Sequence, residues 1–226
     1  MVNDGDIIYQ PGPEARENSR IGQYMHWLAA ERGLSFDDYT ALWEWSVSDI
    51  DAFWRSIWDH FGVESTTPVG DVLGRREMPG AEWFPGTRVN YAGEFLRAAA
   101  ERPDDIAIIG VSQTRDDMSL TFGELTELVA RVRAGLVRLG VGEGDRVVAY
   151  MPNVPETVAA YMATASLGAI WSSAAPEFGP QAVIDRFGQL EPKVLLTVDG
   201  YRYGDQDIDN RDRVTTCREA LPSLRD

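Results

Sequence analysis

Arg202 is the residue of this sequence whose neighbours best suit the binding of a ligand. It stands between Tyr201 and Tyr203, in a predicted turn that also holds Gly200 and Gly204. An arginine held among aromatic rings can bind a phosphate through paired hydrogen bonds or stack on an adenine ring. A lone arginine in a turn is ordinarily a surface residue, so both interpretations stay open.

Few other side chains have types and spacing that suggest catalysis. Glu177 could serve as a general base or metal ligand, but no histidine or second carboxylate stands at ligand spacing from it, so a solvated loop carboxylate is the simpler interpretation. Cys217 is the only cysteine and has no histidine nearby in sequence to act as its base. His26 and His60 fall in predicted helices and are interpreted as helix-surface or C-terminal residues. We therefore assign no catalytic residue and no metal site.

Two features that suggest a nucleotide-phosphate loop do not fit one. The run Gly140–Gly144 follows a predicted helix and opens a predicted strand, whereas a dinucleotide fingerprint must follow a strand and open a helix. A Walker-type lysine could only be Lys193, the single lysine of the chain, and its Glu-Pro-Lys-Val context is no glycine-rich cradle.

The candidate residues follow strands of a predicted α/β fold. Short apolar strands alternate with single helices in the order strand 146–150, helix 155–167, strand 169–173, helix 180–189 and strand 194–198. Such strands indicate a parallel sheet with helices on both faces. Ligands of these sheets bind at the carboxyl ends of strands near the topological switch. Three predicted loops lie there: 151–155, 174–179 and 199–205.

The segment before this core carries weaker signals. We predict a helix over 92–100, a buried strand over 106–111 and a brief strand over 118–121. Thr121 and Glu124 have the spacing of a capping box, and apolar residues behind them keep helical register up to Gly140.

The first 88 residues read as a separate helical part. Residues 1–18 are predicted to be a flexible arm, and 63–88 an irregular connection rich in glycine and proline. Between them, three helices are predicted, with Ser19, Ser35 and Ser48 at their starts. Six of the seven tryptophans lie in this part. They suit an aromatic ligand platform, but large side chains that a small module buries explain them more simply.

Composition excludes several classes of protein. The net charge is −15, which disfavours nucleic acid and anionic membrane surfaces as partners. No apolar run is long enough to cross a membrane, and the acidic N-terminus lacks the basic region of a secretory signal. The single cysteine cannot form an internal disulfide, which fits a cytoplasmic location.

Several segments together resemble the AMP-forming acid–CoA ligases, the acyl-adenylate-forming family. The resemblance rests on 39–47, 90–92, 144–153 and 165–173. Within that family, the segments 171–173, 178–179, 185–193 and 201–203 are most similar to the acetoacetate-specific branch. The resemblance implies a helical N-terminal extension with its connection over 19–88, and the first α/β part of an adenylation domain over 89–226.

The resemblance also implies the chemistry of a longer parent protein. Acetoacetate and ATP would give an acyl-adenylate and pyrophosphate, and CoA would then displace AMP, with Mg²⁺ steadying phosphoryl charge. The family's phosphate loop, ribose-binding aspartate, acyl pocket and catalytic lysine would lie beyond Asp226, so the 226-residue chain alone is expected to be inactive.

One binding residue is carried over by the resemblance. Arg202 matches the first of two basic residues near the nucleotide phosphate of CoA in related ligases, while the second position holds Asp205. The alternatives are a ligase for acetate or propionate and a non-catalytic docking or ligand-binding module. The expected partners are small-molecule substrates and the remaining adenylation and C-terminal domains of the parent.

Overall fold

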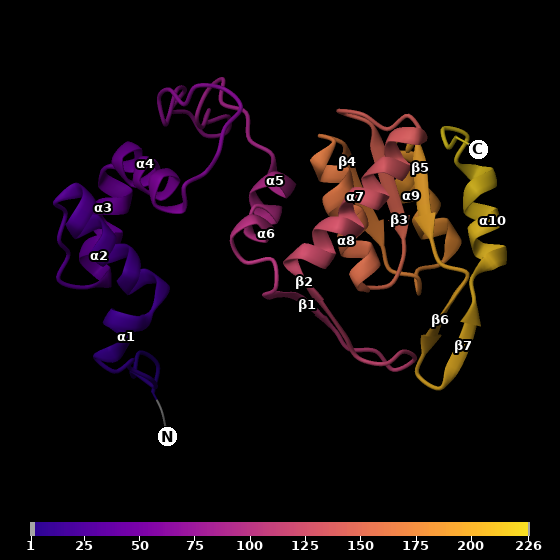
Figure 1. Cartoon of the computed structure of the whole chain (residues 1–226), viewed down its shortest axis with the longest axis horizontal. Coiled ribbons are helices and arrows are strands. Elements are labelled where there is room, and N and C mark those ends of the chain that lie inside the picture. Colours follow the sequence, from indigo (N-terminus) through magenta and orange to yellow (C-terminus); the bar gives the residue numbers. More distant parts are fainter. Residues whose placement is uncertain (1–2, 226) are drawn as a thin grey trace. The chain divides into compact units, whose positions relative to one another are not determined.

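The computed structural model describes residues 3–225, which divide between two compact units (Figure 1). The first, Met1–Val89, is here named the helical unit, and the second, Asn90–Asp226, the α/β unit. Residues 1 and 2 of the predicted arm, and Asp226 at the end of the predicted α/β part, lie outside the described residues. No helix among the described residues is long and apolar enough to span a membrane.

The described part of the helical unit contains four helices. They are α1 (Glu14–Asn18), α2 (Arg20–Arg32), α3 (Tyr39–Ser48) and α4 (Ile50–Phe61). Ser19 caps α2 by accepting a hydrogen bond from the amide of Gly22, and Gly33 ends the helix with φ +67°. Both helix limits were predicted because Ser is a good N-cap and glycine adopts the left-handed conformation without strain.

The starts of α3 and α4 were predicted at the wrong residues. The side chain of Asp38, not Ser35, caps α3, so this helix begins at Tyr39. Asp49, not Ser48, caps α4 through the amide of Ala52. Ser48 still belongs to α3, where its hydroxyl donates to a backbone carbonyl of that helix. For α4 the cap is thus the carboxylate of Asp49, which directly follows the predicted Ser48. The spacing of the apolar residues did not distinguish the two.

The core of the helical unit is aromatic. Tyr24, Met25, Leu28 and Leu42 form its buried cluster, and partly buried Trp27 and Trp45 pack against it with other large side chains. The Tyr24 hydroxyl is 2.5 Å from the Ser56 hydroxyl, which satisfies both groups inside the core. Packing thus accounts for Trp27 and Trp45.

The α/β unit contains the rest of the regular structure. Its elements are α5 (Tyr91–Leu96), α6 (Ala98–Glu101), β1 (Ile106–Gly110), β2 (Met118–Thr121), α7 (Phe122–Arg138), β3 (Arg146–Tyr150), α8 (Pro155–Ser166), β4 (Ile170–Ala174), α9 (Pro180–Gly188), β5 (Val194–Thr197), β6 (Gly200–Tyr203), β7 (Gln206–Asp209) and α10 (Arg211–Ala220). Residues 92–100, predicted as one helix, are divided between α5 and α6. The capping box of Thr121 and Glu124 is present at the start of α7.

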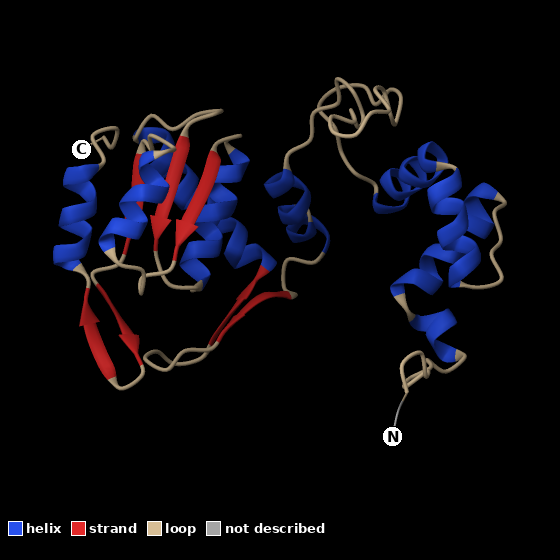
Figure 2. Cartoon of the chain, turned by 180° about the vertical axis from the view of Figure 1, so that it is seen from behind, coloured by secondary structure: helices blue, strands red, loops and turns tan. Residues whose placement is uncertain are grey.

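A three-stranded parallel sheet of order β4-β3-β5 lies at the centre of the α/β unit (Figure 2). Side chains of β3 alternate between two cores, since successive residues of a strand point to opposite faces. Val147 packs in a core with α7 and α8, and Val148 packs in a core with α9 and α10. The predicted parallel sheet with helices on both faces is therefore confirmed.

Two antiparallel hairpins stand outside this sheet, and both differ from the prediction. β1 pairs with β2, and Ile106 and Ile109 of β1 are 56% and 71% exposed, so this strand is not the buried sheet strand that its apolar sequence suggested. β6 pairs with β7, and β6 lies within the loop predicted over 199–205. The strands of this second hairpin contain alternating polar residues. They have no continuous apolar run, which is the signal by which the parallel strands were predicted.

Candidate functional site

A cavity of about 600 Å³ lies where three segments of the α/β unit meet. The end of β1 with the loop between β1 and β2 supplies one wall, the loop from β3 into α8 a second, and the residues after β5 with most of β6 a third. Both ribbon views show the β1–β2 loop reaching toward the β6–β7 hairpin (Figures 1 and 2). Residues of two of the three predicted strand-end loops, 151–155 and 199–205, therefore line the cavity.

The strand order explains why the cavity forms at this edge. From β3 the chain moves to β4 on one side, then crosses to β5 on the other side of β3. The loops that follow β3 and β5 thus diverge at the carboxyl ends of adjacent strands. This is the topological switch point at which doubly wound sheets bind ligands. The position of the cavity agrees with the predicted location of a ligand site.

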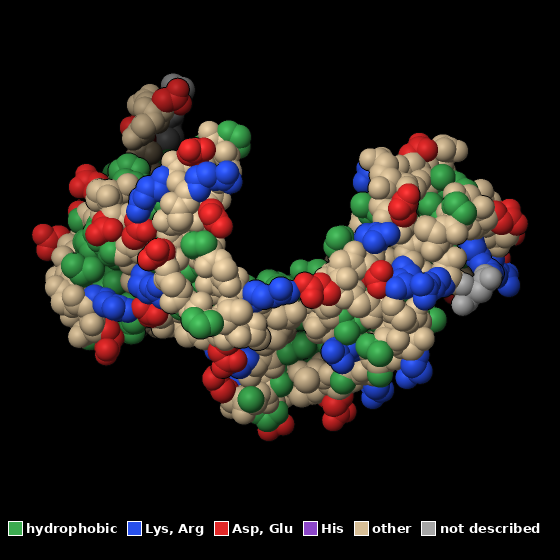
Figure 3. Space-filling model, turned by 90° about the horizontal axis from the view of Figure 1, so that it is seen from above, with side chains coloured by type: hydrophobic (Ala, Val, Ile, Leu, Met, Phe, Trp, Pro, Cys, Tyr) green, Lys and Arg blue, Asp and Glu red, His purple; other side chains and the backbone are tan. Residues whose placement is uncertain are grey.

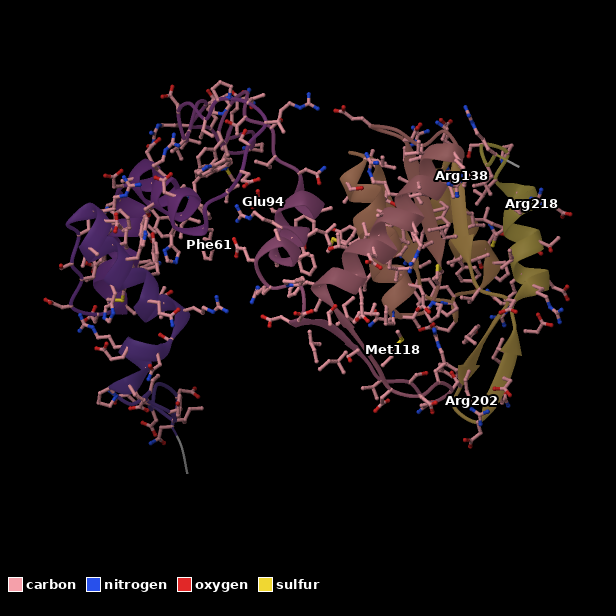
Figure 4. The ribbon with its side chains drawn as sticks, viewed as in Figure 1. Phe61, Glu94, Met118, Arg138, Arg202 and Arg218 are labelled. Carbon is pink, nitrogen blue, oxygen red and sulfur yellow. The ribbon has the colours of Figure 1, made fainter. Side chains whose placement is uncertain are left out.

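Arg202 lines this cavity from β6 (Figure 4). Its Nη1 donates to Oδ1 of Asp207 at 3.1 Å, and its Nε donates to the carbonyl of Gly204 at 3.3 Å. The Arg202 side chain is 35% exposed and that of Asp207 is 83% exposed. Arg202 is thus partly covered and held in place, on a strand rather than in the turn that was predicted.

The hairpin that carries Arg202 begins with a close approach of its two strands. A Cβ atom added to Gly200 would lie 2.8 Å from the carbonyl oxygen of Ile208 on β7, closer than real Cβ contacts allow. Gly204 at the other end has φ +57°, which suits its place in the tight turn. Glycine at both positions therefore allows the hairpin that carries Arg202 to form.

Arg115 is a second arginine of the cavity, and the sequence did not single it out. It lies in the β1–β2 loop, and its Nη1 donates to Oε1 of Glu156 at 2.7 Å. Glu156 belongs to the first turn of α8, and the hydrogen bond from Arg115 is the main cause that lowers the pKa of this carboxyl. The two residues are 41 positions apart. No local pattern links positions so distant, so only the fold brings them together.

The third predicted loop, 174–179, is not part of the cavity lining. It is attached to the sheet by Tyr150, whose hydroxyl lies 3.0 Å from the carbonyl oxygen of Pro176 and also contacts that of Phe178. Glu177 is exposed on this loop. Among residues 3–225, no group of three or more His, Cys, Asp or Glu side chains is arranged to hold a metal. The described residues thus do not fit a Mg²⁺ site, and we assign no step to that ion.

Gly140–Gly144 and Lys193 have a structural role. The glycine run connects α7 to β3, as predicted. Nζ of Lys193 lies 2.6 Å from Oδ2 of Asp145 and also donates to the carbonyl of Gly140, and the same carboxylate oxygen accepts from the amide of Gly142 at 2.8 Å. The hydrogen bond from Lys193 is the largest cause that lowers the pKa of Asp145. The contacts of Lys193 therefore stabilise the turn between α7 and β3.

The remaining candidate residues lie away from the cavity lining. Cys217 is fully buried in the core beside α9, and burial raises the pKa of its thiol, which disfavours the reactive thiolate. His26 is exposed on α2, within 3.8 Å of Glu17. His60 packs against the rings of Tyr24 and Trp27 in the helical unit. Each of the three side chains is thus placed by packing or by an exposed surface contact in its own unit.

Acidic and basic side chains are interspersed on the face seen in Figure 3. No single-sign patch dominates that view. Arg202, Arg211 and Lys193 each pair with an aspartate. Any phosphate group would therefore be bound by locally placed donors rather than by the overall field of a chain with net charge −15.

Two protein-family models match the chain. The family described as AMP-binding enzyme matches residues 95–225, which is more than half of the 226 residues. The family described as acetyl-coenzyme A synthetase N-terminus matches residues 39–94. Together the two matches run through most of both units.

Relatives and solved structures point to the same group. An acetoacetyl-coenzyme A synthetase of Rhizobium meliloti (strain 1021) is 39% identical over 219 residues, which are 96% of this chain and 33% of that protein. Acetoacetyl-CoA synthetase of Macaca fascicularis is 33% identical over 218 residues, 94% of this chain and 32% of that protein. The structure of acetoacetyl-CoA synthetase from Streptomyces lividans is 46% identical, with a TM-score of 0.91 over 96% of this chain and 34% of that one.

The chain thus spans about a third of the length of the curated relatives that it matches. The relatives confirm the predicted resemblance to acid–CoA ligases and to their acetoacetate-specific branch.

Proposed function

Because the chain belongs to the AMP-binding enzyme family, we propose that it is the N-terminal portion of an ATP-dependent, AMP-forming ligase that joins acetoacetate to CoA. One observation carries this proposal: the likeness to acetoacetyl-CoA synthetases runs through the helical unit as well as the α/β unit. A likeness confined to the α/β unit would point only to the broader family.

The proposed reaction has two steps. The carboxylate of acetoacetate attacks the α-phosphorus of ATP, so that pyrophosphate leaves and acetoacetyl-adenylate forms. The thiolate of CoA then attacks the acyl carbonyl, and AMP leaves with the bonding electrons of the acyl–oxygen bond. The first step can be followed alone by exchange of pyrophosphate into ATP, whereas the second needs CoA.

We assign one contact of the second step to this chain. Arg202 lines the cavity at the switch point, and a guanidinium can form two parallel hydrogen bonds with a phosphate. Arg202 would therefore bind a phosphate group of CoA, in place of its present contact with Asp207. Arg202 would thus bind CoA without taking part in the formation or cleavage of covalent bonds.

The two units take different parts in the proposal. Residues 19–88 form the helical N-terminal extension with its connection, preceded by the arm, and 89–226 form the first α/β part of the adenylation domain. The remaining adenylation domain and the C-terminal domain of the parent would supply the binding sites for ATP, for the acyl group and for Mg²⁺. We also place the parent protein in the cytoplasm.

The test is an assay of the full-length protein with a series of acids. ATP–pyrophosphate exchange is measured with acetoacetate, acetate and propionate, followed by thioester formation with CoA. We expect acetoacetate to be preferred about tenfold or more in kcat/KM, the scale at which a site discriminates between small acyl groups. The 226-residue chain alone is the control and should give no exchange.

Two results would contradict the proposal in different ways. A preference for acetate or propionate would show a related short-chain ligase and reject acetoacetate as substrate. Absence of exchange with every acid in the full-length protein would reject a ligase and favour a non-catalytic docking or ligand-binding module.

A further inference from the structure

Arg213 lies between two tyrosines at the carboxyl end of the sheet. Its Nη1 donates to the hydroxyl of Tyr201 at 3.1 Å, and the hydroxyl of Tyr150 is one of the groups that raise the pKa of its guanidinium. Tyr150 is the last residue of β3, Tyr201 belongs to β6, and Arg213 is in the first turn of α10. The hydrogen bond from Arg213 thus connects α10 with β6.

The hydrogen bonds of this cluster have a defined direction. A guanidinium only donates, so the phenol oxygen of Tyr201 accepts from Arg213. The single hydroxyl hydrogen of Tyr150 then serves the backbone carbonyls of Pro176 and Phe178 in the loop after β4. Tyr150 is fully buried, so water does not compete for these bonds. The cluster therefore runs from α10 through the end of β3 to the loop 174–179.

The same cluster fixes the orientation of the hairpin that carries Arg202. Adjacent residues of a strand point to opposite faces. Since the side chain of Tyr201 is directed to Arg213, the side chain of Arg202 leaves β6 on the other face, where it meets Asp207. A change in the place of Tyr201 would therefore move Arg202 as well.

The charge of Arg213 is not taken up by a carboxylate. Arg202 pairs with Asp207 and Arg211 pairs with Asp209, but Arg213 forms no ion pair with any described carboxylate. The planar, fixed geometry of a guanidinium, rather than charge alone, suits the hydrogen bond that holds Tyr201.

We propose that Arg213 is a positioning residue for the acyl-acceptor step: by holding Tyr201 in place, it fixes the neighbouring Arg202 where the phosphate of CoA binds. The inference rests on the proposed function, because it assigns Arg213 an effect that is exerted through Arg202. It does not place Arg213 in contact with substrate.

The test is a double-mutant cycle in the full-length protein. The variants are Arg213→Gln, Arg202→Ala and the two together, each assayed for KM of CoA, for kcat and for pyrophosphate exchange without CoA. We expect Arg213→Gln to raise KM for CoA about tenfold, within the range for coupled neighbours, with exchange unchanged. In the Arg202→Ala background the same change should raise KM no further, because the residue through which it acts is gone.

Three further variants define the role of the guanidinium. Arg213→Lys keeps the charge but loses the planar fork, so most of the rise in KM should remain. Tyr201→Phe removes the acceptor, keeps the ring, and should raise KM in the same direction even if Arg213→Gln fails to fold. Arg211→Gln is the matched control on the same helix, since Arg211 is 75% exposed and pairs with Asp209 outside the cluster.

The outcomes separate this inference from the proposed function. A rise in KM for Arg202→Ala with none for Arg213→Gln and Tyr201→Phe overturns the positioning role and leaves the proposed CoA contact standing. Additive rises in the double variant, or a parallel loss of exchange, also overturn the positioning role. No change of KM in Arg202→Ala overturns both the CoA contact and the positioning role.

Discussion

Arg202 and Asp207 stand directly opposite each other on β6 and β7, with Nη1 and Oδ1 3.1 Å apart. The Asp207 side chain is 83% exposed, so solvent screens the pair and makes it weak. A phosphate offers more charge and two acceptor oxygens to a guanidinium. The aspartate can therefore hold Arg202 in place without preventing its use by an anionic ligand.

Replacing Arg202 by alanine in the full-length protein should raise KM for CoA about ten- to a hundredfold. One charge-assisted contact with a phosphate is worth about 1.5–3 kcal/mol. ATP–pyrophosphate exchange without CoA should stay unchanged, and the effect on KM should shrink at high salt, where screening already weakens the contact. Arg131→Ala, an exposed change on α7, is the control. If the rate of ATP–pyrophosphate exchange and the rate of thioester formation both fell, Arg202 would have a structural role and no specific contact with CoA.

Replacing Asp207 by asparagine should act in the opposite direction. The variant frees Arg202 from an exposed partner, so KM for CoA should fall, by about fivefold at most, since exposed pairs contribute little. Steady-state kinetics with CoA varied measures the change. A rise in KM instead would show that Asp207 is needed to orient the guanidinium.

The contact between Lys193 and Asp145 should stabilise the chain mainly above the acid range. Its loss in Lys193→Met leaves the carboxylate of Asp145 without its closest donor, so the urea midpoint at pH 7 should fall. Because Lys193 lowers the folded pKa of Asp145, its contribution is present above the unfolded value of about 3.9 and is lost as pH falls through the folded value.

Circular dichroism of urea unfolding between pH 2 and pH 7 checks both parts of that prediction. The difference in midpoint between the parent sequence and Lys193→Met should narrow as the solution is made acidic. A difference that is independent of pH would assign the role of Lys193 to its bond with the carbonyl of Gly140 instead.

The helical unit should lose stability when His60 is protonated. Burial lowers the pKa of His60, which packs against the rings of Tyr24, Trp27 and Phe61. Below about pH 6.5 the unfolded chain therefore binds a proton that the folded chain resists, and stability declines until the lowered folded pKa is passed.

Tryptophan fluorescence can follow this change selectively, because six of the seven tryptophans belong to the helical unit. His60→Gln should remove the decline over this pH range, whereas His26→Gln should keep it, since His26 is exposed. An equal decline in His60→Gln would point to another group.

Thr121→Ala should destabilise the α/β unit by about 1 kcal/mol, within the range of about 0.5–2 kcal/mol for a lost N-cap. The hydroxyl of Thr121 accepts from the amide of Glu124 at 3.2 Å, and the carboxylate of Glu124 accepts from the amide of Thr121 at 2.9 Å. Thr121→Ser keeps the acceptor and should retain most of the stability. Urea unfolding measured for both variants decides whether the capping box contributes as expected.

The elements predicted best from the sequence are those whose signals lie within a few neighbouring residues. The capping box at Thr121 and the apolar run of β3 are each decided within a few residues, and both were placed correctly. Ser48 and Asp49 are adjacent caps of similar quality, so the start of α4 was missed by a choice that propensity does not settle.

The site was harder to predict than the sheet. A two-residue turn of Gly204 and Asp205 between polar alternating segments is a recognised hairpin signal, and it could have revealed β6 and β7. The contacts of Arg115 with Glu156, and of Arg213 with Tyr201, depend on how separate elements pack. No spacing rule reaches across such elements, so these arginines were missed.

Strand β3 has a paired neighbour on both sides, and its residues Val147–Tyr150 are buried. Its backbone amides can meet water only if the whole sheet opens, so they should be among the last to exchange with deuterium. The hairpin of β1 and β2 can open by breaking only its own ladder and should exchange much earlier. One wall of the cavity thus follows a strand that is expected to exchange slowly, and another belongs to a hairpin that is expected to open by itself. A bound ligand should therefore slow the exchange of the hairpin far more than that of the strand.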